Sequence, residues 1–216
     1  MNFIVNGPHS GPLCIFAHGA GAPMDSGFMG DVAEQLGERG ICVVRFEFPY
    51  MQERRNIGKK RPPNRQPELL TCFTEAIQLA VKTYGDGQGC YLMGKSMGGR
   101  MASILSTECG GLVEGITINK VFALGYPFHP INKPEKLRTE HFSALPCPLH
   151  VFQGTRDKLG GKTCVAMLDL AKQVNMHWLE DGDHDLKPRV KSGYTQQQHL
   201  DTVIDTIANI IIKREK

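Results

Sequence analysis

The chain has 216 residues, of which 41% are hydrophobic and 22% charged, and a formal net charge of +3. The length suits one domain, 1–216, rather than two marginal halves, and the composition is ordinary for a globular protein. So small a positive charge does not argue for nucleic-acid binding. No apolar run approaches the roughly 20 residues that span a bilayer. No secretion signal is expected, because the first residues lack a basic segment followed by an apolar stretch.

Apolar runs and helical spacings of apolar side chains alternate along the chain. In chain order we expect a strand at 13–17, a helix at 28–39, a strand at 41–46, a polar loop at 49–67, a helix at 68–84, a strand and helix at 89–109, strands at 121–125 and 149–153, a helix at 162–173, a strand at 176–179 and a helix at 195–212. This alternation predicts an α/β fold. It is a three-layer α/β/α sandwich with a mostly parallel sheet of about six to seven strands.

The most informative segment runs from Cys90 to Arg100. Here an apolar strand leads into Gly94-x-Ser96-x-Gly98 and directly into a helix. This is the context of a nucleophile elbow, a turn so sharp that glycine is needed two residues before and after the nucleophile. The turn would expose the hydroxyl of Ser96 above the sheet. The alternative interpretation is a glycine-rich helix start with a serine N-cap.

Two further loops carry the other groups that serine chemistry requires. Asp157 follows the strand at 149–153, and His184 follows the strand at 176–179. A serine hydroxyl is a weak nucleophile, so a histidine must accept its proton and a carboxylate must orient that imidazole. The chain order Ser96, Asp157, His184 is the order of α/β-hydrolases. We therefore predict these three as catalytic residues.

Some of the neighbouring polar residues offer alternatives. Asp157 is also placed to cap the helix that begins a few residues later. Asp183 and Asp185 flank His184, but adjacent side chains seldom point at one another. We therefore expect these two carboxylates to tune the pKa of His184 or to fix its loop, and partnership of one of them with the imidazole remains the alternative.

Four other histidines fit structural roles. His18 follows the first strand and is expected to brace its loop. His150 and His177 fall inside strands and are expected to be core residues with satisfied hydrogen bonds. His199 lies on the closing helix and is expected to be solvated.

The loop at 18–22, with the sequence His-Gly-Ala-Gly-Ala, follows the first strand. Acyl transfer passes through a tetrahedral intermediate whose oxyanion needs two preorganised N–H donors. We expect Met97, at the N-terminus of a helix, to provide one donor. Ala20 is the candidate for the second, with Gly21 next. The alternative is a glycine turn without this role.

Two segments bear on the shape and charge of the site. Only residues 126–148 separate two of the strands, too few for a large cap domain, so we expect an open site. The loop at 49–67 is basic through Arg54, Arg55, Lys59, Lys60, Arg61 and Arg65. It is either an ordinary solvated loop or an electropositive rim for anionic substrates or an acidic partner. Nucleic acid is not expected, because no aromatic residues are interleaved for base stacking.

The cysteines are scattered and never form C-x-x-C pairs. They are Cys14, Cys42, Cys72, Cys90, Cys109, Cys147 and Cys164. Most lie in apolar strand or helix patterns, where a reduced cysteine is a small buried hydrophobe. We therefore expect a reducing, cytoplasmic compartment, with neither disulfides nor a metal or other cofactor.

Five motifs together resemble one known family. They are FAHGAGAPMDS (16–26), GKSMGGR (94–100), LGYPFHP (124–130), QGTRD (153–157) and GDHD (182–185). They are similar to small bacterial α/β-hydrolases related to testis-expressed protein 30, within the dienelactone-hydrolase-like group. The resemblance covers nearly the whole chain. It implies the α/β-hydrolase fold without a large cap domain, with Ser96 as nucleophile, Asp157 as acid and His184 as base. Dienelactone hydrolases proper use cysteine, so the serine argues against that particular activity.

The sequence therefore predicts a carboxylesterase-like serine hydrolase. It would cleave a small-molecule ester or related acyl compound through an acyl-enzyme. The competing hypothesis is a non-catalytic module of the same fold that binds a protein partner through its surface loops, because some eukaryotic relatives resemble interaction subunits. A pure scaffold has no physical need for three chemically matched residues on three loops, which favours the enzyme. Neither a nucleic-acid nor a membrane partner is expected, and the substrate and any protein partner are not identified.

Overall fold

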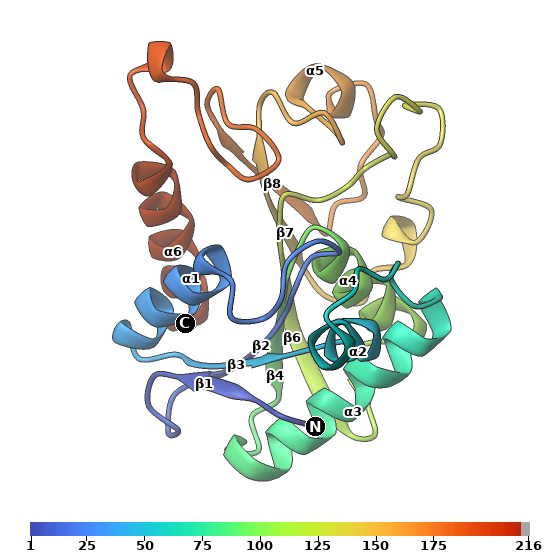
Figure 1. Cartoon of the computed structure of the whole chain (residues 1–216), viewed down its shortest axis with the longest axis vertical. Coiled ribbons are helices and arrows are strands. Elements are labelled where there is room, and N and C mark those ends of the chain that lie inside the picture. Colours follow the sequence, from blue (N-terminus) through green and yellow to red (C-terminus); the bar gives the residue numbers. More distant parts are fainter. Residues whose placement is uncertain (213–216) are drawn as a thin grey trace.

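A central β-sheet runs through the computed structural model, which describes residues 1–212 (Figure 1). Neighbouring strands follow the order β1-β3-β2-β4-β6-β7-β8, and β5 pairs with β6 beside this path. The strands are β1 (Ile4–Asn6), β2 (Leu13–Ala17), β3 (Cys42–Phe46), β4 (Cys90–Lys95), β5 (Leu112–Val113), β6 (Ile116–Leu124), β7 (Leu149–Gly154) and β8 (Val174–Leu179). The helices are α1 (Gly27–Glu38), α2 (Pro49–Ile57), α3 (Gln66–Tyr84), α4 (Met97–Glu108), α5 (Lys162–Val165) and α6 (Gln196–Ile212), with 3-10 helices η1 (Phe142–Ala144) and η2 (Val190–Ser192).

The sheet is parallel at its centre and has two short antiparallel additions. Strands β2, β3, β4, β6, β7 and β8 pair in parallel, whereas β1 is antiparallel to β3 and β5 to β6. The mostly parallel sheet is confirmed, with eight strands in the described residues instead of six to seven. β1 and β5 have only three and two residues, too few to show a period in the sequence. The loops after β2, β4, β7 and β8 leave the sheet at one edge.

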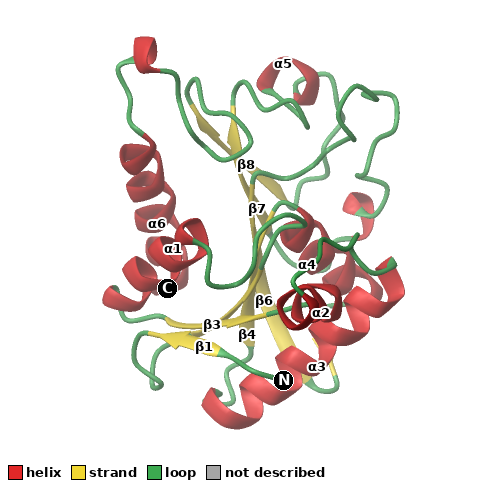
Figure 2. Ribbon diagram, in the orientation of Figure 1, coloured by secondary structure: helices red, strands yellow, loops and turns green. Residues whose placement is uncertain are grey.

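Helices cover both faces of the sheet, which confirms the three-layer architecture (Figure 2). α1 and α6 lie on one face, and α3 and α4 on the other. Side chains of β2 alternate between the layers: Phe16 packs with α1 and α6, and Ile15 with α3 and α4. Burying a side chain of this size contributes about 1.5–3 kcal/mol to folding. Within residues 1–212, none of the helices has the length and apolar content to cross a bilayer.

The segment expected as a loop at 49–67 begins with a helix, so this prediction was wrong for residues 49–57. Pro49 lies in the first turn of α2, where its missing N–H costs no hydrogen bond. Tyr50 and Met51 are buried, and Gly58 ends the helix in the left-handed conformation. The other side chains of α2 are mostly polar, which leaves too short an apolar pattern for the sequence to reveal the helix.

The helix expected at 162–173 was also wrong in length, because α5 ends at Val165. Beyond it the chain tightens into turns, in which the N–H of Met167 and the N–H of Leu168 each bond a carbonyl three residues earlier. Leu168 and Leu170 still pack against the core from these turns. The apolar spacing that predicted a longer helix is therefore satisfied by turns, and tertiary packing overrides local propensity.

The connection between β6 and β7 is short, as predicted. Residues 126–148 are all described and form turns and the one-turn helix η1. They contribute no large cap domain, in agreement with what the sequence resemblance implies. The edge of the sheet where β4, β7 and β8 end is consequently left to be covered by loops.

Candidate active site

The sharp turn between β4 and α4 has the geometry that the sequence predicts. Ser96 adopts φ 53° and ψ −113°, a strained conformation for a residue with a side chain. A Cβ at Gly94 would lie 2.1 Å from the carbonyl carbon of Gly98, and a Cβ at Gly98 would lie 2.4 Å from the carbonyl oxygen of Ala17. Both positions therefore require glycine. Packing of the turn against its own helix and against β2 fixes where the hydroxyl of Ser96 lies.

The structure brings Ser96, Asp157 and His184 together from the loops after β4, β7 and β8. His184 Nε2 lies 2.8 Å from Ser96 Oγ, and His184 Nδ1 lies 2.8 Å from Asp157 Oδ2. The side chain of Asp157 is fully buried, whereas that of His184 is 27% exposed. With its proton on Nδ1, directed at the carboxylate, the imidazole has Nε2 free to accept the hydroxyl proton. The arrangement can therefore activate a serine for attack on a carbonyl.

Asp157 is held by its own neighbours and does not cap α5. Gln153 Nε2 donates to Asp157 Oδ2 at 2.8 Å, and the N–H of Leu159 donates to Asp157 Oδ1 at 2.8 Å. The N-cap of α5 is Gly161, which removes the capping alternative. Both carboxylate oxygens are thus oriented, and one of them faces the imidazole.

The two aspartates beside His184 fix its loop. Asp183 Oδ1 accepts hydrogen bonds from the N–H of Asp185 and the N–H of Lys187, at 2.9 and 3.0 Å. Asp185 instead forms an ion pair with Lys95, with its Oδ1 3.1 Å from Nζ. Neither carboxylate has a hydrogen bond to the imidazole. The expectation that they fix the loop agrees with this geometry, which leaves Asp157 as the partner of His184.

His18 braces its loop, as expected, and His199 departs from the prediction. His18 Nδ1 donates to the carbonyl of Gly19 at 2.7 Å, and its Nε2 accepts from the N–H of Phe48 at 3.1 Å. Burial lowers the pKa of His18, which favours this neutral state. The expectation of a solvated His199 was wrong: it is buried, and its Nδ1 donates to the carbonyl of Leu186 at 2.8 Å. α6 packs this side chain against the loop that carries His184.

His150 and His177 form a pair at the edge of the sheet. The prediction that they are core residues was wrong in part, because both are only half-buried. His150 Nδ1 lies 3.1 Å from His177 Nε2, and the two rings stack. Burial, followed by the nearby His177, lowers the pKa of His150 to about 4. β8 is the edge strand of the sheet and has a neighbouring strand on one side only. His150 on β7 and His177 on β8 are therefore left partly exposed.

A cavity of about 560 Å³ opens beside Ser96. The loop at 19–22 and the first turn of α1, with Phe28 and Met29, line it. His184, residues of the loop that follows it and Lys95, next to Ser96, line it as well. Phe28 and Met29 provide apolar lining, and the loop after His184 provides polar lining. The cavity is therefore suited to a small molecule with an apolar part that lies against α1.

The loop predicted to hold an oxyanion donor lies against the cavity. Ala20 lines it together with Ser96, and a Cβ at Gly19 would lie 3.6 Å from the Cβ of Ser96. Tyr50 Oη donates to the carbonyl of Ala20 at 3.1 Å and is 3.3 Å from the carbonyl of Gly19. These bonds fix the carbonyl side of the loop. Met97, the other predicted donor, begins α4 directly after Ser96.

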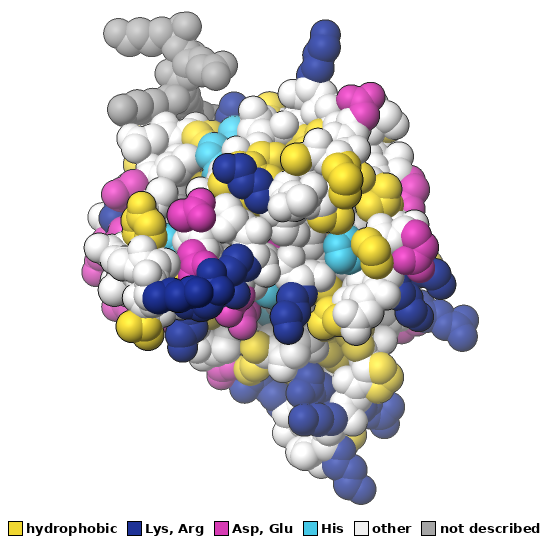
Figure 3. Space-filling view, turned by 90° about the horizontal axis from the view of Figure 1, so that it is seen from above, with side chains coloured by type: hydrophobic (Ala, Val, Ile, Leu, Met, Phe, Trp, Pro, Cys, Tyr) yellow, Lys and Arg dark blue, Asp and Glu magenta, His cyan; other side chains and the backbone are white. Residues whose placement is uncertain are grey.

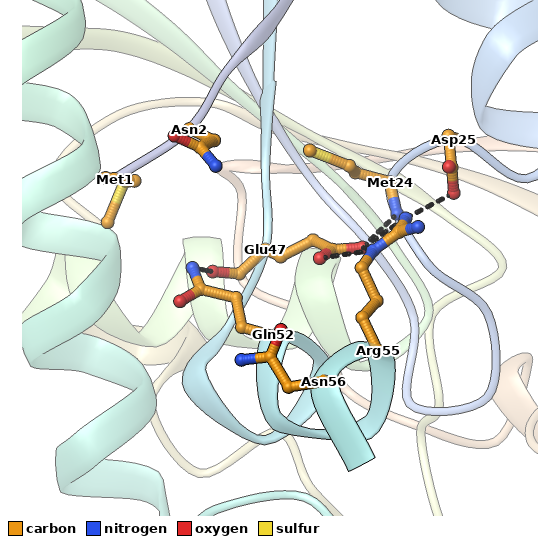
Figure 4. A pocket seen from close by; sticks show the side chains of 8 residues that line it. All are labelled: Met1, Asn2, Met24, Asp25, Glu47, Gln52, Arg55 and Asn56. Atoms are coloured by element: carbon orange, nitrogen blue, oxygen red, sulfur yellow. Dashed lines mark hydrogen bonds and ion pairs between the residues drawn. The ribbon is translucent and has the colours of Figure 1, made fainter. Parts of the chain in front are cut away.

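A charged cluster connects α2 to the segment that precedes α1 (Figure 4). Arg55 Nε donates to Glu47 Oε2 at 2.8 Å, and its Nη2 lies 2.5 Å from Asp25 Oδ1. Glu47 Oε1 in turn accepts from the N–H of Met24 at 3.3 Å. The hydrogen bond from Arg55 lowers the pKa of Asp25. A second cavity, of about 420 Å³, adjoins this cluster, whose charged groups already have partners within the protein.

The basic side chains of the segment at 49–67 fall into two groups, those with partners within the protein and those that are exposed. Arg54 and Arg55 contact the loop at 19–25, and Arg61 pairs with Glu53 at 2.7 Å. Lys59, Lys60 and Arg65 are exposed. When the molecule is seen from above relative to Figure 1, Lys and Arg side chains gather in the lower part of the face, and at the left some of them lie beside acidic groups (Figure 3). Part of the expected electropositive rim is therefore used for internal contacts.

The sequence model of a family described as "Alpha/beta hydrolase domain" matches residues 10–212. The chain belongs to this alpha/beta hydrolase family. The match spans all of the loops described above, including those that carry Ser96, Asp157 and His184. Membership agrees with the fold and with the class of protein that the five sequence motifs resemble.

Solved structures of a hydrolase, a lipase and the protein Est1E share the alpha/beta hydrolase fold. Dienelactone hydrolase from Anabaena variabilis has a TM-score of 0.70 and 17% identity, over 99% of this chain and 92% of that chain. Est1E from Butyrivibrio proteoclasticus has a TM-score of 0.66 and 14% identity, over 95% and 94%. Monoacylglycerol lipase from Paleococcus ferrophilus has a TM-score of 0.67 and 13% identity, over 96% and 98%. At these identities the likeness shows the fold alone.

Sequence reasoning missed the residues that support the alpha/beta hydrolase site. Gln153 and Tyr50 orient other site residues, yet neither is reactive. Gln153 offered one signal, an amide at the end of an otherwise apolar strand. Tyr50 offered none, because its helix was taken for a loop. Among residues 1–212, no three His, Cys, Asp or Glu side chains are arranged to hold a metal ion.

Proposed function

We propose that this alpha/beta hydrolase is a serine hydrolase of the carboxylesterase type that cleaves an ester or related acyl compound. The observation that carries the proposal is the continuous hydrogen-bonded chain from Ser96 Oγ through His184 to Asp157, beside a 560 Å³ cavity. Its reactive end lies at the cavity, and its carboxylate end is fully buried. A nucleophile must be accessible to substrate, and the acid that orients its base must be shielded from water. Ser96 at the cavity and the buried Asp157 meet these two requirements.

In the first half-reaction Ser96 Oγ attacks the acyl carbon while His184 Nε2 accepts the hydroxyl proton. The negatively charged Asp157 stabilises the imidazolium that forms. The N–H of Ala20 and the N–H of Met97 are proposed to bind the oxyanion of the tetrahedral intermediate. His184 then returns the proton to the leaving alcohol, which departs and leaves an acyl-Ser96.

In the second half-reaction water replaces the alcohol. His184 Nε2 takes a proton from the water, which attacks the acyl carbon and passes through a second tetrahedral intermediate. The proton moves from His184 to Ser96 Oγ as the ester bond to serine breaks. The carboxylic acid product is released and Ser96 is restored, so no cofactor enters the cycle.

The proposed substrates are small esters with an apolar acyl part. The apolar wall formed by Phe28 and Met29 supports this, because it offers contact to a hydrocarbon or aromatic group. Among the structural neighbours are an esterase domain from a Rhodothermus marinus protein, a monoacylglycerol lipase and a structure described as ferulic acid bound to Est1E. Their names agree with ester chemistry on this fold. A large polymer is not proposed, because the cavity of about 560 Å³ is of small-molecule size.

Labelling with a fluorophosphonate probe tests the nucleophile without knowledge of the substrate. We expect the label on the peptide that contains Ser96, and none in Ser96→Ala. The exposed Ser10→Ala is the matched control and should label like the natural protein. Because Ser96→Ala removes one oxygen from an unchanged turn, its Tm should stay close to that of the parent. An unlabelled Ser96 in folded protein, with a reference serine hydrolase labelled alongside, would exclude the proposal.

The competing proposal, a non-catalytic module that binds a protein partner, has the exposed Lys59, Lys60 and Arg65 as its support. Turnover separates the two. An activated short-chain ester that is hydrolysed by the protein, but by neither Ser96→Ala nor His184→Ala, decides for the enzyme. A panel of acyl, thioester and lactone substrates then narrows the substrate class. We propose neither nucleic acid nor a membrane surface as a partner.

A cytoplasmic location belongs to the same proposal. Its support is that all seven cysteines are free, five of them buried and two half-buried. Burial raises the pKa of Cys72 and Cys90 to about 12, which keeps these thiols protonated and inert. Small buried hydrophobes of this kind are typical of a reducing compartment.

A further inference from the structure

Lys95 lies directly before Ser96 and has an unusual environment for a lysine. Its side chain is only 10% exposed. Nζ donates to the backbone carbonyl of His184 at 2.5 Å and lies 3.1 Å from Asp185 Oδ1. The ring centroid of Phe28 is 5.4 Å away. The ammonium of Lys95 thus contacts the loop that carries the proposed base, His184. The backbone of Lys95 is bonded directly to that of the proposed nucleophile, Ser96.

Stability alone does not explain a lysine at this position. Burial removes the ammonium from water and lowers the pKa of Lys95, which the nearby Asp185 opposes. Asp185 is 69% exposed, and pairing with so exposed a carboxylate returns little of the desolvation cost. An apolar side chain of the same length would bury more favourably. We therefore look for a role of the Lys95 charge in the proposed active site.

The loop around His184 has anchors other than Lys95 at Asp183 and Leu186. Asp183 accepts two backbone N–H bonds, and the carbonyl of Leu186 accepts from His199 Nδ1. For the carbonyl of His184, Lys95 Nζ is the donor in the described part of the chain. Carbonyl and imidazole belong to the same residue, so a displaced peptide also moves Nε2 away from Ser96 Oγ.

Gly125, at the end of β6, leaves space for this contact. It has φ +68°, and a Cβ there would lie 3.0 Å from Lys95 Nζ and 2.6 Å from the carbonyl oxygen of His184. A side chain at this position would push the two groups apart. The absence of a Cβ at Gly125 and the length of the Lys95 side chain are thus two independent features. Both allow Lys95 Nζ to contact the carbonyl oxygen of His184.

We propose that Lys95 is a positioning residue whose ammonium holds the backbone carbonyl of His184 and so keeps the imidazole in line between Ser96 and Asp157. Lys95 acts through His184 and does not itself meet the reacting atoms. This inference rests on the proposed serine chemistry, because it gives Lys95 a task only if His184 serves Ser96.

Lys95→Met tests the proposal, because methionine has a similar length and no hydrogen-bond donor. A misplacement of reacting groups by about 1 Å costs about 100-fold in rate, so we expect kcat on an activated ester to fall by about that factor. KM should stay within about threefold, and fluorophosphonate labelling of Ser96 should slow in parallel with kcat. The Tm should change by only a few degrees, because removal of a buried charge and loss of the donor to the His184 carbonyl act in opposite directions. Lys172→Met, which removes an exposed lysine before β8, is the control for loss of charge.

A wild-type kcat in Lys95→Met overturns the proposal. So does a raised KM with unchanged kcat, which would make Lys95 a substrate-binding residue. Should Lys95→Met not fold, Lys95→Leu makes the same measurement with a smaller apolar side chain.

A second readout does not depend on turnover. We expect the Nδ1 proton of His184, directed at Asp157 Oδ2, to give a downfield proton NMR resonance that His184→Gln removes. We expect this resonance to shift or broaden in Lys95→Met, and an unchanged resonance contradicts the positioning role. If the natural protein neither labels nor hydrolyses any ester, the proposed function fails, whereas the resonance still reports on the contact between Lys95 and His184.

Discussion

Gln153 donates a hydrogen bond from Nε2 to Oδ2 of Asp157, the same carboxylate oxygen that faces His184 Nδ1. Gln153 is fully buried in β7, and its Oε1 accepts from the N–H of Tyr126 at 2.7 Å. The amide therefore links the backbone after β6 to the acid of the proposed triad. It thus holds the carboxylate oxygen that the imidazole contacts.

Replacing this amide should weaken both the fold and the site. In Gln153→Leu the N–H of Tyr126 loses its acceptor and Asp157 loses a donor, and leaving buried polar groups unpaired costs about 1–3 kcal/mol each. We expect a lower free energy of unfolding in urea. We also expect a lower kcat, with a loss smaller than that in His184→Ala, because the imidazole remains. A stable and fully active Gln153→Leu would show that Asp157 needs no such support.

The partner of His184 can be identified by comparing two aspartates. Asp157→Asn should lower kcat by about 10⁴-fold, the loss seen when the acid of another serine triad becomes an amide and the imidazole takes the wrong tautomer. Asp183→Asn is the matched control, since Asp183 bonds only backbone N–H groups of its own loop. Its loss of kcat should be less than tenfold, about the scale of one weakened hydrogen bond. The reverse ranking would assign the acid to Asp183.

Removal of one hydroxyl group tests the support of the loop at 19–22. Tyr50→Phe loses the hydrogen bonds to the carbonyls of Gly19 and Ala20. Because burial raises the pKa of Tyr50, the hydroxyl donates throughout the pH range of an assay. We expect a lower kcat on an activated ester and a loss of about 1 kcal/mol in the free energy of unfolding. Tyr194→Phe, at a tyrosine that is 49% exposed, controls for loss of a hydroxyl. Equal kcat in both variants would contradict the role of Tyr50.

The pair of His150 and His177 should make stability depend on pH. The folded-state pKa of His150, about 4, lies below the ordinary value of 6.5. Between these values the unfolded chain binds more protons, so stability rises with pH across the window and is lost as pH falls from 6.5 to 4. His150→Phe keeps the stacking on Phe122 and removes one titrating group. Its free energy of unfolding, measured in urea at several pH values, should fall less steeply than that of the parent. Parallel curves would contradict the assignment.

The parts of the fold that repeat a strong pattern were predictable. Short and mostly apolar runs such as β2 and β3, and long helices such as α3 and α6, can be recognised from the pattern of their own residues. The elbow was predictable for a related reason, because glycine at Gly94 and Gly98 is demanded by steric contact. The order of Ser96, Asp157 and His184 along the chain can likewise be read directly from the sequence.

What escaped prediction depends on contacts between distant residues. α2 is stabilised where Tyr50 and Met51 are buried against the core, and its own sequence is too polar to reveal this. His199 is buried because α6 returns to the loop that carries His184. Gln153 contacts Tyr126 in the loop after β6, and Lys95 contacts His184 in the loop after β8. The sequence contains no distances between such loops.

The proposed triad draws one residue each from the loops after β4, β7 and β8, and β8 is the last strand within the described residues 1–212. During synthesis the ribosome releases the nucleophile first, then its acid, and the base after both. Nascent chains that end before β8 hold a serine without its proton acceptor. Fluorophosphonate reactivity should therefore switch on only once the segment beyond β8 has emerged, so the order of strands along the chain would keep unfinished polypeptides from carrying out hydrolysis.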